Sequence, residues 1–165
     1  FGSGFVAVNP NSKIPAMMGH GVRPPLRVFE SGSMLLYLAE KFGAFIPKDP
    51  AARTEMMNWL FWQVGTAPVL GNFGVFYDDA PEKIDYAINR YTNEAKRLYG
   101  VMDRRLGEAK YFAGEYSIAD IAIYPWVARY EWHRVDLAGF PNVKRWYDAV
   151  GARPAVVKGM AVPQV

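Results

Sequence analysis

The feature that most restricts the fold of this chain is a long helical pattern in its middle. Between residues 82 and 107, apolar side chains recur with the helical period of about 3.6 over about seven turns. The apolar positions are Ile84, Ala87, Ile88, Tyr91, Ala95, Leu98, Met102 and Leu106. Such a stripe is buried only when other elements cover it, so the pattern predicts a helical bundle built around this helix.

Two further stretches in the second half of the chain also predict helices. Residues 51–64 are apolar on nearly every side, which indicates a helix that is buried on more than one face. Pro68 and the glycines around it are expected to bend or interrupt this helix. A last helix is predicted for residues 142–152, between two prolines.

A capping box marks the start of another helix in the same bundle. Ser117 is followed three residues later by Asp120, and an apolar run then continues to Tyr130. In this motif the serine side chain accepts a hydrogen bond from the first turn, and the acidic side chain accepts one from the serine N–H. The sequence therefore predicts a helix N-terminus at Ser117.

The first part of the chain has a different pattern of apolar residues. Short apolar runs at 14–18 and 26–29 flank a loop rich in glycine and proline, which predicts a β-hairpin with a long connection. A helix is predicted to begin at Ser31 and to end before Gly43, because glycine suits the left-handed conformation of a helix C-terminus. This part of the chain is therefore predicted to be α/β.

A linker with two prolines separates the α/β part of the chain from the helical part. We expect a mixed α/β unit over residues 1–43, a linker over 44–50, and an all-helical domain over 51–165. The first residue is Phe1 rather than methionine, and no initiating element precedes the hairpin. The chain is therefore expected to be truncated or processed at its start.

Composition argues against several classes of function. The net charge is +3 with charged residues finely interspersed, so no basic face for nucleic acid is predicted. No apolar run reaches the roughly 20 residues of a membrane span, and no secretory leader is recognisable. The absence of cysteine fits a cytoplasmic protein. Neither His20 nor His133 has a partner at metal-ligand spacing, so no metal site is predicted and both are expected to be surface or hydrogen-bonded residues.

The candidate site lies between Lys13 and Ser31. A proline at position 15 begins the first strand and is a candidate for a cis peptide bond that turns the N–H and C=O of Ile14 toward a ligand. Such a backbone pair can bind a peptide as an added strand. Glu30 ends the second strand and Ser31 is expected to cap the next helix, whose N-terminus favours a carboxylate. Together they can hold a zwitterionic γ-glutamyl group, or they can be a plain cap beside a solvated acid.

The order of these features resembles the glutathione transferases. N-P-N-S-K-I-P at 9–15 and R-V-F-E-S-G-S-M-L-L-Y-L-A-E-K-F at 27–42 resemble their glutathione-binding half. Y-S-I-A-D-I-A-I at 116–123 resembles the capping motif of their all-helical domain. N-W-L-F-W-Q at 58–63 and A-I-N-R-Y-T-N-E-A-K-R at 87–97 are similar to the bacterial Nu-class branch, which includes disulfide-bond oxidoreductases. The resemblance covers essentially the whole chain.

The resemblance implies a role for each candidate in binding glutathione. Ile14 would pair its backbone with the cysteinyl unit, next to a cis Pro15. Glu30 and Ser31 would bind the γ-glutamyl end, and Lys13 is placed to meet the glycyl carboxylate. In this family the thiolate-stabilising residue lies on a strand–helix–strand that precedes the hairpin, and that segment is expected to be missing here. No catalytic residue is therefore assigned, and the chain alone is expected to be inactive.

The resemblance also implies residues outside the hairpin and a partner subunit. Arg90 matches a Nu-class arginine that reaches a glutathione held by the neighbouring subunit, although from the residues alone it is a solvated arginine. Gln63 is expected to face the same cleft as Ile14. A homodimer is expected because the helix carrying residues 59–62 is too apolar for one buried face, and members of this family pair through this region.

Two functions are compatible with the sequence, together with a third that explains less. The first is a glutathione transferase-like enzyme, with glutathione as co-substrate, that activates its thiol for addition to an electrophile or for reduction of a disulfide. The Nu-class similarity favours the disulfide reaction. The alternative is a non-catalytic binding or scaffold module on the same fold. An unrelated helical interaction domain would leave the Ile-Pro and Glu-Ser pairs unexplained.

Overall fold

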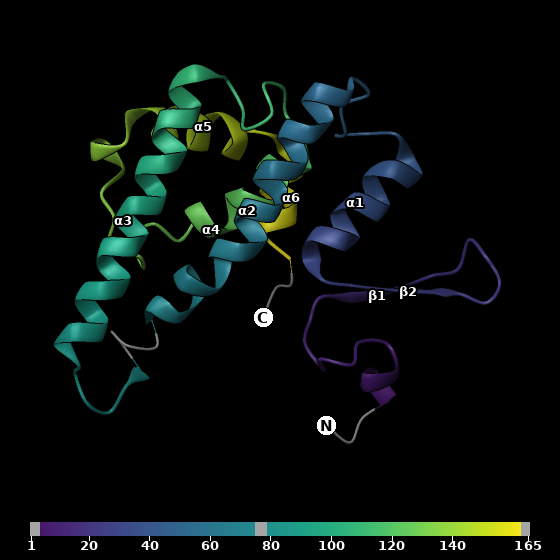
Figure 1. The fold of residues 1–165 in the computed structure, drawn as a ribbon, viewed down its shortest axis with the longest axis horizontal. Helices are drawn as coiled ribbons and strands as arrows, with labels where there is room; N and C mark the ends of the chain where they lie inside the picture. The colour runs from purple at the N-terminus through teal and green to yellow at the C-terminus, as the bar shows by residue number, and fades with distance from the viewer. Residues whose placement is uncertain (1–3, 75–78, 163–165) are drawn as a thin grey trace.

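The computed structural model describes residues 4–74 and 79–162. A short 3-10 helix and a two-stranded hairpin lie to one side of a group of helices (Figure 1). The elements in chain order are η1 (Gly4–Ala7), β1 (Ala16–Gly19), β2 (Leu26–Phe29), α1 (Ser31–Phe42), α2 (Pro50–Gly74), α3 (Asp85–Glu108), α4 (Ile118–Val127), η3 (Leu137–Gly139), α5 (Pro141–Gly151) and α6 (Pro154–Met160). In the described part of the chain, no helix is long and apolar enough to span a bilayer.

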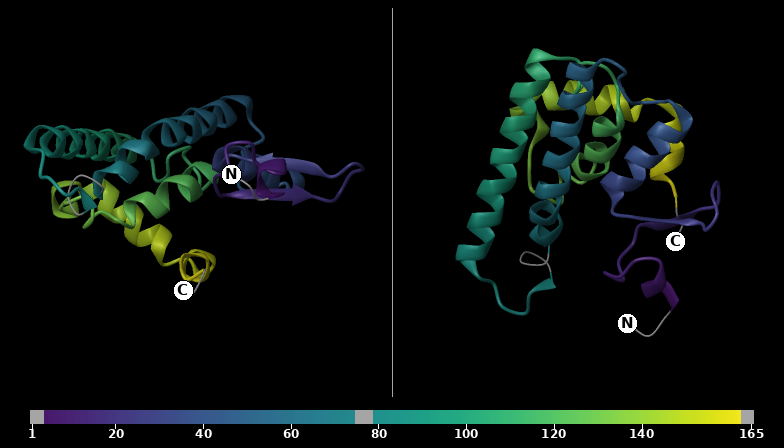
Figure 2. Two further views of the ribbon diagram at one scale, coloured as in Figure 1. Left: turned by 90° about the horizontal axis from the view of Figure 1, so that it is seen from below. Right: turned by 45° about the vertical axis from the view of Figure 1, so that its right-hand side comes forward.

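The predicted hairpin is confirmed. Strands β1 and β2 pair in antiparallel register, with Ala16 opposite Phe29 and Gly19 opposite Leu26. The first strand begins at Ala16 rather than at residue 14, in keeping with the inability of Pro15 to donate a ladder hydrogen bond. The connection between the strands extends away from the helices (Figures 1 and 2).

Helix α1 has the predicted bounds and lies close to α2. Gly43 has a φ of 61°, and its N–H donates to the carbonyl oxygen of Ala39, which ends the helix as expected. Gly32 is buried in the first turn, and a Cβ at this position would lie 3.0 Å from a methyl carbon of Val64. The absence of a side chain at Gly32 therefore permits the close approach of α1 to α2.

Helix α2 is longer than predicted, and of the bend or interruption expected around Pro68, the interruption is wrong. It continues without a break through Pro68 to Gly74. This stretch is held by packing on α4: Leu70 is buried, and the ring of Trp126 lies 3.5 Å from where a Cβ on Gly71 would stand. Packing of this kind outweighs the single backbone hydrogen bond that a proline removes.

The bundle core forms around α3, as its apolar stripe predicted. Ala95, Leu98, Tyr99, Met102 and Leu106 are the buried residues of this helix. They join buried side chains of α2, α4 and α5 in one apolar cluster. The periodicity of the sequence therefore identified the helix at the centre of the fold.

The capping box at the start of α4 is confirmed and also links distant parts of the core. The carboxylate of Asp120 accepts hydrogen bonds from the backbone N–H of Ser117 at 3.0 Å and of Phe112 at 3.2 Å. It also accepts one from the indole N–H of Trp146 on α5, at 2.8 Å. Burial raises the pKa of Asp120, and these donors oppose that effect.

The C-terminal helices are organised by residues far away in sequence. Asp103 of α3 accepts hydrogen bonds from the backbone N–H groups of Asn142 and Val143, which caps the N-terminus of α5. Helix α5 matches the last helix predicted from the sequence. Helix α6 was not predicted; it begins at Pro154, a residue that suits the first turn of a helix.

Candidate functional site

A cleft of about 500 Å³ forms where the loop before β1 meets the first turn of α1 and the middle of α2. It is lined by Asn9, Asn11, Lys13, Ile14, Pro15, Glu30, Ser31, Gln63, Val64, Pro68 and Trp126. Four of the five residues predicted to bind a ligand, Lys13, Ile14, Glu30 and Ser31, therefore line one cleft.

The loop that presents Ile14 is held by a buried asparagine. Asn9 is 1% exposed, its side-chain amide donates to the carbonyl oxygen of Lys13 at 2.6 Å, and its Oδ1 accepts from the N–H of Asn11 at 2.9 Å. The peptide bond between Ile14 and Pro15 is cis, as predicted. Asn9 was missed as a site residue, although Asn-Pro-Asn is a recognisable turn signal.

The start of α1 differs from the prediction in one respect. Ser31 is the first helical residue, and the N-cap position is taken by Glu30, whose φ is 67° and whose side chain makes no capping hydrogen bond. A positive φ is uncommon outside glycine, and here it turns the chain from β2 into the helix in a single residue. The expectation that Ser31 caps the helix is therefore wrong, and its hydroxyl is not used as a cap.

The first turn of α1 forms one end of the cleft and favours the binding of an anion there. The first N–H groups of a helix have no partner within the helix and carry a partial positive charge. The Glu30 carbonyl accepts the Met34 N–H at 2.9 Å, which leaves the preceding N–H groups at the cleft end of the helix. An exposed carboxylate, Glu30, stands beside them, so the site offers both donors for an anion and an acceptor for a cation.

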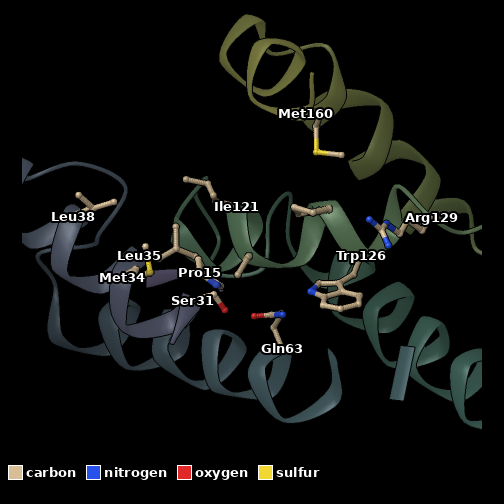
Figure 3. Close-up of a pocket in the computed structure, with 12 residues that line it drawn as sticks. Pro15, Ser31, Met34, Leu35, Leu38, Gln63, Ile121, Trp126, Arg129 and Met160 are labelled. Carbon is tan, nitrogen blue, oxygen red and sulfur yellow. The ribbon is translucent and has the colours of Figure 1, made fainter. Parts of the chain in front are cut away.

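A second cavity of about 490 Å³ joins the first. The two share Pro15, Ser31, Gln63 and Trp126. The second cavity is otherwise lined by Met34, Leu35, Leu38, Ile121, Ala122, Pro125, Arg129 and Met160 (Figure 3). These side chains come from α1, α4, the turn after α4 and α6. Because α1, α4 and α6 are far apart in sequence, no local motif indicates that they meet.

Gln63 lies at the junction of the two cavities. Its side chain is directed between Ser31 and Trp126 (Figure 3). It is 5% exposed, and its Oε1 has no hydrogen-bond partner among the described residues. The expectation that Gln63 faces the cleft is confirmed.

Arg90 lies apart from the cleft. It is exposed on α3, in a shallow hollow that is lined by Tyr86, Asn89, Asn93, Glu94 and Arg97. A hydrogen bond from Arg97 lowers the pKa of Glu94 in this hollow. Within one chain, the structure does not bring Arg90 together with the other predicted residues.

The two histidines lie outside the cleft. His133 is fully buried, and its Nδ1 lies 3.0 Å from the hydroxyl of Tyr99, as expected for a hydrogen-bonded core histidine. Burial lowers the pKa of His133 to about 4 and raises that of Tyr99. His20 is exposed on the connection between the strands.

A family model, related sequences and a solved structure all resemble this chain, and all three are glutathione transferases or their relatives. Residues 85–149 match the glutathione S-transferase C-terminal domain. The disulfide-bond oxidoreductase YghU of Escherichia coli is 57% identical over 98% of this chain, and the chain spans 59% of the length of that relative. The disulfide-bond oxidoreductase YfcG of the same organism is 45% identical, and the chain spans 77% of it.

A solved structure agrees with the fold over the whole chain. The glutathione transferase YghU of Streptococcus pneumoniae, complexed with glutathione, superimposes with a TM-score of 0.92 at 46% identity. The superposition covers 100% of this chain and 67% of that protein. The likeness therefore includes the hairpin as well as the helices.

Proposed function

This chain belongs to the glutathione transferase family, and from that premise we propose that the cleft beside the first turn of α1 binds glutathione. The observation that carries the proposal is the convergence of Lys13, Ile14, Glu30 and Ser31 on one cleft. The S. pneumoniae relative, which has a closely similar fold, is complexed with glutathione.

The tripeptide lies along the loop before β1 in this proposal. The backbone N–H and C=O of Ile14 pair with the cysteinyl unit as a short added strand. The γ-glutamyl carboxylate accepts from the first N–H groups of α1 and from Ser31, while its ammonium group binds the carboxylate of Glu30. Lys13 binds the glycyl carboxylate.

The reaction that we favour is reduction of a disulfide by glutathione. Two molecules of glutathione are oxidised to glutathione disulfide while a substrate disulfide is reduced to two thiols, with both protons passing from the glutathione thiols to the products. Support comes from the two E. coli relatives, both of which are disulfide-bond oxidoreductases. Conjugation to an electrophile uses the same thiolate and is the other reaction open to such a site.

Turnover needs a group that holds the glutathione thiol as thiolate. A free thiol has a pKa of about 8.5, and each unit by which it is lowered requires about 1.4 kcal/mol of selective stabilisation. We assign no residue of this chain to that role. The proposal for this chain is therefore binding, and turnover is proposed for a protein that also supplies this group.

The arrangement also suggests how copies of the chain pair. Phe61 on α2 is 65% exposed and Tyr86 on α3 is 79% exposed, which leaves large apolar side chains for a partner subunit to cover. In a homodimer formed through these helices, Arg90 would reach glutathione in the partner's cleft. We also propose that the chain is organised as an α/β unit over residues 1–43 and an all-helical domain over 51–165, joined by a linker over 44–50.

Calorimetric titration of the chain with glutathione tests the binding proposal. Glu30→Gln should weaken binding about ten-fold or more, because a charged hydrogen bond to the ammonium group is lost. Glu40→Gln is the matched control: it removes an acid near the opposite end of α1, outside the cleft, and should leave the affinity unchanged. A wild-type chain that fails to bind glutathione would overturn the proposal.

A non-catalytic binding module is the second candidate function. It would use the same cleft to bind glutathione. The two candidates differ in turnover. The chain extended by the first strand–helix–strand of a related transferase should reduce a small disulfide with glutathione if the enzyme proposal is correct, and should bind without turnover if the module proposal is correct.

A further inference from the structure

A hollow outside the cleft brings together aromatic rings and positive charge. It has a volume of about 400 Å³ and forms where the linker after α1, the loop between α3 and α4, and the residue before α6 meet. Its lining includes Phe45, Lys110, Tyr111, Glu115, Tyr116 and Arg153. None of these described residues lines the cleft or the adjoining apolar cavity, so the hollow is a separate candidate site of a size that suits a small molecule.

The cation at the centre of this hollow is held in place by the protein. The Cζ of Arg153 lies 3.7 Å from the centroid of the Tyr116 ring, so its guanidinium group lies over that ring. The N–H of Arg153 donates to the carbonyl oxygen of Val150 at 3.1 Å, and its own carbonyl accepts from the N–H of Val157 at 3.0 Å. Arg153 is therefore positioned before any ligand arrives, which lowers the entropy cost of binding one.

The two cations that line the hollow form no ion pair with an acid among the described residues. This holds for both Arg153 and Lys110. Arg97 on α3, by contrast, donates to both carboxylate oxygens of Glu94, at 2.8 and 2.6 Å. An arginine presents its donors as a planar fork that matches the oxygens of a phosphate or a carboxylate. Arg153 and Lys110 are therefore available to bind an anionic group.

The ring of Phe45 offers a surface for a planar group. Phe45 is 49% exposed, and its ring meets that of Tyr116 edge to face, with centroids 5.7 Å apart and an interplanar angle of 89°. Its carbonyl oxygen accepts from the N–H of Ile118 at 3.0 Å, which fixes the linker against the start of α4. An exposed ring that is fixed in this way can stack on an aromatic ring of a ligand.

Glu115 restricts the chemistry of the ligand further. It is exposed at the hollow and makes no ion pair with the other described residues. A carboxylate is an acceptor only, so it repels a simple aromatic acid but binds a ligand that also carries hydroxyl or amino donors. The hollow therefore suits a molecule with an anionic group, a planar ring and donors of its own.

We propose that this hollow is a binding site for a nucleoside monophosphate. The phosphate accepts hydrogen bonds from Arg153 and Lys110, and the base stacks on Phe45. A ribose hydroxyl or the amino group of the base donates to Glu115. The site is separate from the cleft, so this inference does not depend on the binding of glutathione.

Calorimetric titration of the whole chain with AMP tests the proposal. AMP should bind with one site per chain, and adenosine, inorganic phosphate and phenyl phosphate should each bind at least ten-fold more weakly, because each lacks one of the contacts. Inorganic phosphate that binds as well as AMP would mean that charge alone is recognised. Equal binding of phenyl phosphate would mean that the nucleoside is not recognised. Either result, or no binding of AMP, would overturn the proposal.

Variants of the hollow locate the site. Arg153→Gln should weaken AMP binding about ten-fold, because a charged hydrogen bond is lost, and Phe45→Leu should do the same through the loss of stacking. Arg129→Gln is the matched control: the Cζ of Arg129 also lies near an aromatic ring, 5.9 Å from the centroid of Trp132, but Arg129 lines the apolar cavity. This variant should leave AMP affinity unchanged.

A further variant keeps the test decisive if Arg153→Gln does not fold. Lys110→Gln changes an exposed side chain, so it should leave the unfolding temperature unchanged and weaken AMP binding about three-fold. Unchanged AMP affinity in every variant of the hollow that folds would overturn the proposal. Weaker binding in Arg129→Gln alone would place AMP in the apolar cavity and would overturn it as well.

Discussion

The helical bundle and the segment that precedes α1 differ in how far their apolar side chains are buried. In the bundle, Leu98, Met102, Phe112 and Trp146 are each at most 1% exposed. Before α1, by contrast, the side chain of Ile14 is 85% exposed. The bundle therefore supplies most of the folding stability, while the segment before α1 presents polar and backbone groups to a ligand.

This contrast predicts that substitutions in the two regions affect different measurements. Variants in the bundle should change the free energy of unfolding, and variants in the segment before α1 should change ligand affinity. The segment is followed by α1, which packs on α2 and α4 of the bundle. Each prediction below either tests this separation or measures how complete it is.

The largest effect is expected from Trp146→Ala in the bundle. Trp146 is fully buried, its ring lies 5.2 Å from that of Phe112, and its indole N–H donates to Asp120. Removing a buried tryptophan should lower the free energy of unfolding by about 3–5 kcal/mol. Urea unfolding followed by circular dichroism measures this. A loss below about 1 kcal/mol would show that the core does not depend on α5.

The next effect is a dependence of bundle stability on pH. Burial lowers the pKa of His133 to about 4 in the folded protein, from an ordinary value of 6.5. Its contribution to stability is complete above pH 6.5 and is lost as the pH falls toward 4, because the unfolded chain binds a proton that the folded chain excludes. The free energy of unfolding should fall by about 3 kcal/mol from this group.

His133→Gln tests this origin directly. Glutamine keeps a polar group near the hydroxyl of Tyr99 but does not titrate. The variant is expected to be less stable than the wild type at pH 7, and its stability should decline less steeply between pH 6.5 and 4. Urea unfolding across that range gives both curves. Parallel curves would show that another group causes the decline.

On the other side of the comparison, Asn9→Ala should affect binding more than folding. Asn9 fixes the loop through its hydrogen bonds to Lys13 and Asn11. Its loss should cost about 1 kcal/mol of folding free energy, or less, because the loop contributes little to the core. Glutathione affinity should fall about ten-fold, because the loop that presents Ile14 is no longer held in place. Calorimetric titration measures the affinity.

Glu115→Ala is the control for this prediction. Glu115 is exposed between α3 and α4 and does not line the cleft. Its replacement should change neither the free energy of unfolding nor glutathione affinity appreciably. If Asn9→Ala destabilised the protein as much as Trp146→Ala, the two regions would form one cooperative unit and the separation would be wrong.

The same contrast explains which parts of the structure could be predicted from the sequence. The bounds of α1 and the start of α4 follow from local signals, namely Gly43 and the capping box of Ser117 and Asp120. The continuation of α2 through Pro68 could not be foreseen, because it depends on packing against Trp126, which is far away in sequence. Local signals decide helix ends, and tertiary contacts decide whether a weak point breaks a helix.

In the candidate site, too, the residues that lie close together in sequence could be predicted and those that come from distant elements could not. Lys13, Ile14, Glu30 and Ser31 could be predicted because they lie within one short segment that carries recognisable turns and a helix start. The apolar cavity could not, since α4 and α6 reach it from distant parts of the chain. The positive φ of Glu30 also has no signal in the sequence, because it is imposed by the turn from β2 into α1.

The smallest effect is expected at the ion pair that joins α1 to α2. Arg53 and Glu40 approach to 2.5 Å, but their side chains are 41% and 52% exposed. Exposed pairs contribute little because water screens them, so Glu40→Gln should lower the free energy of unfolding by less than about 0.5 kcal/mol. Urea unfolding at low and high salt measures this. A larger, salt-dependent loss would mean that charge, rather than the close approach at Gly32, holds α1 against α2.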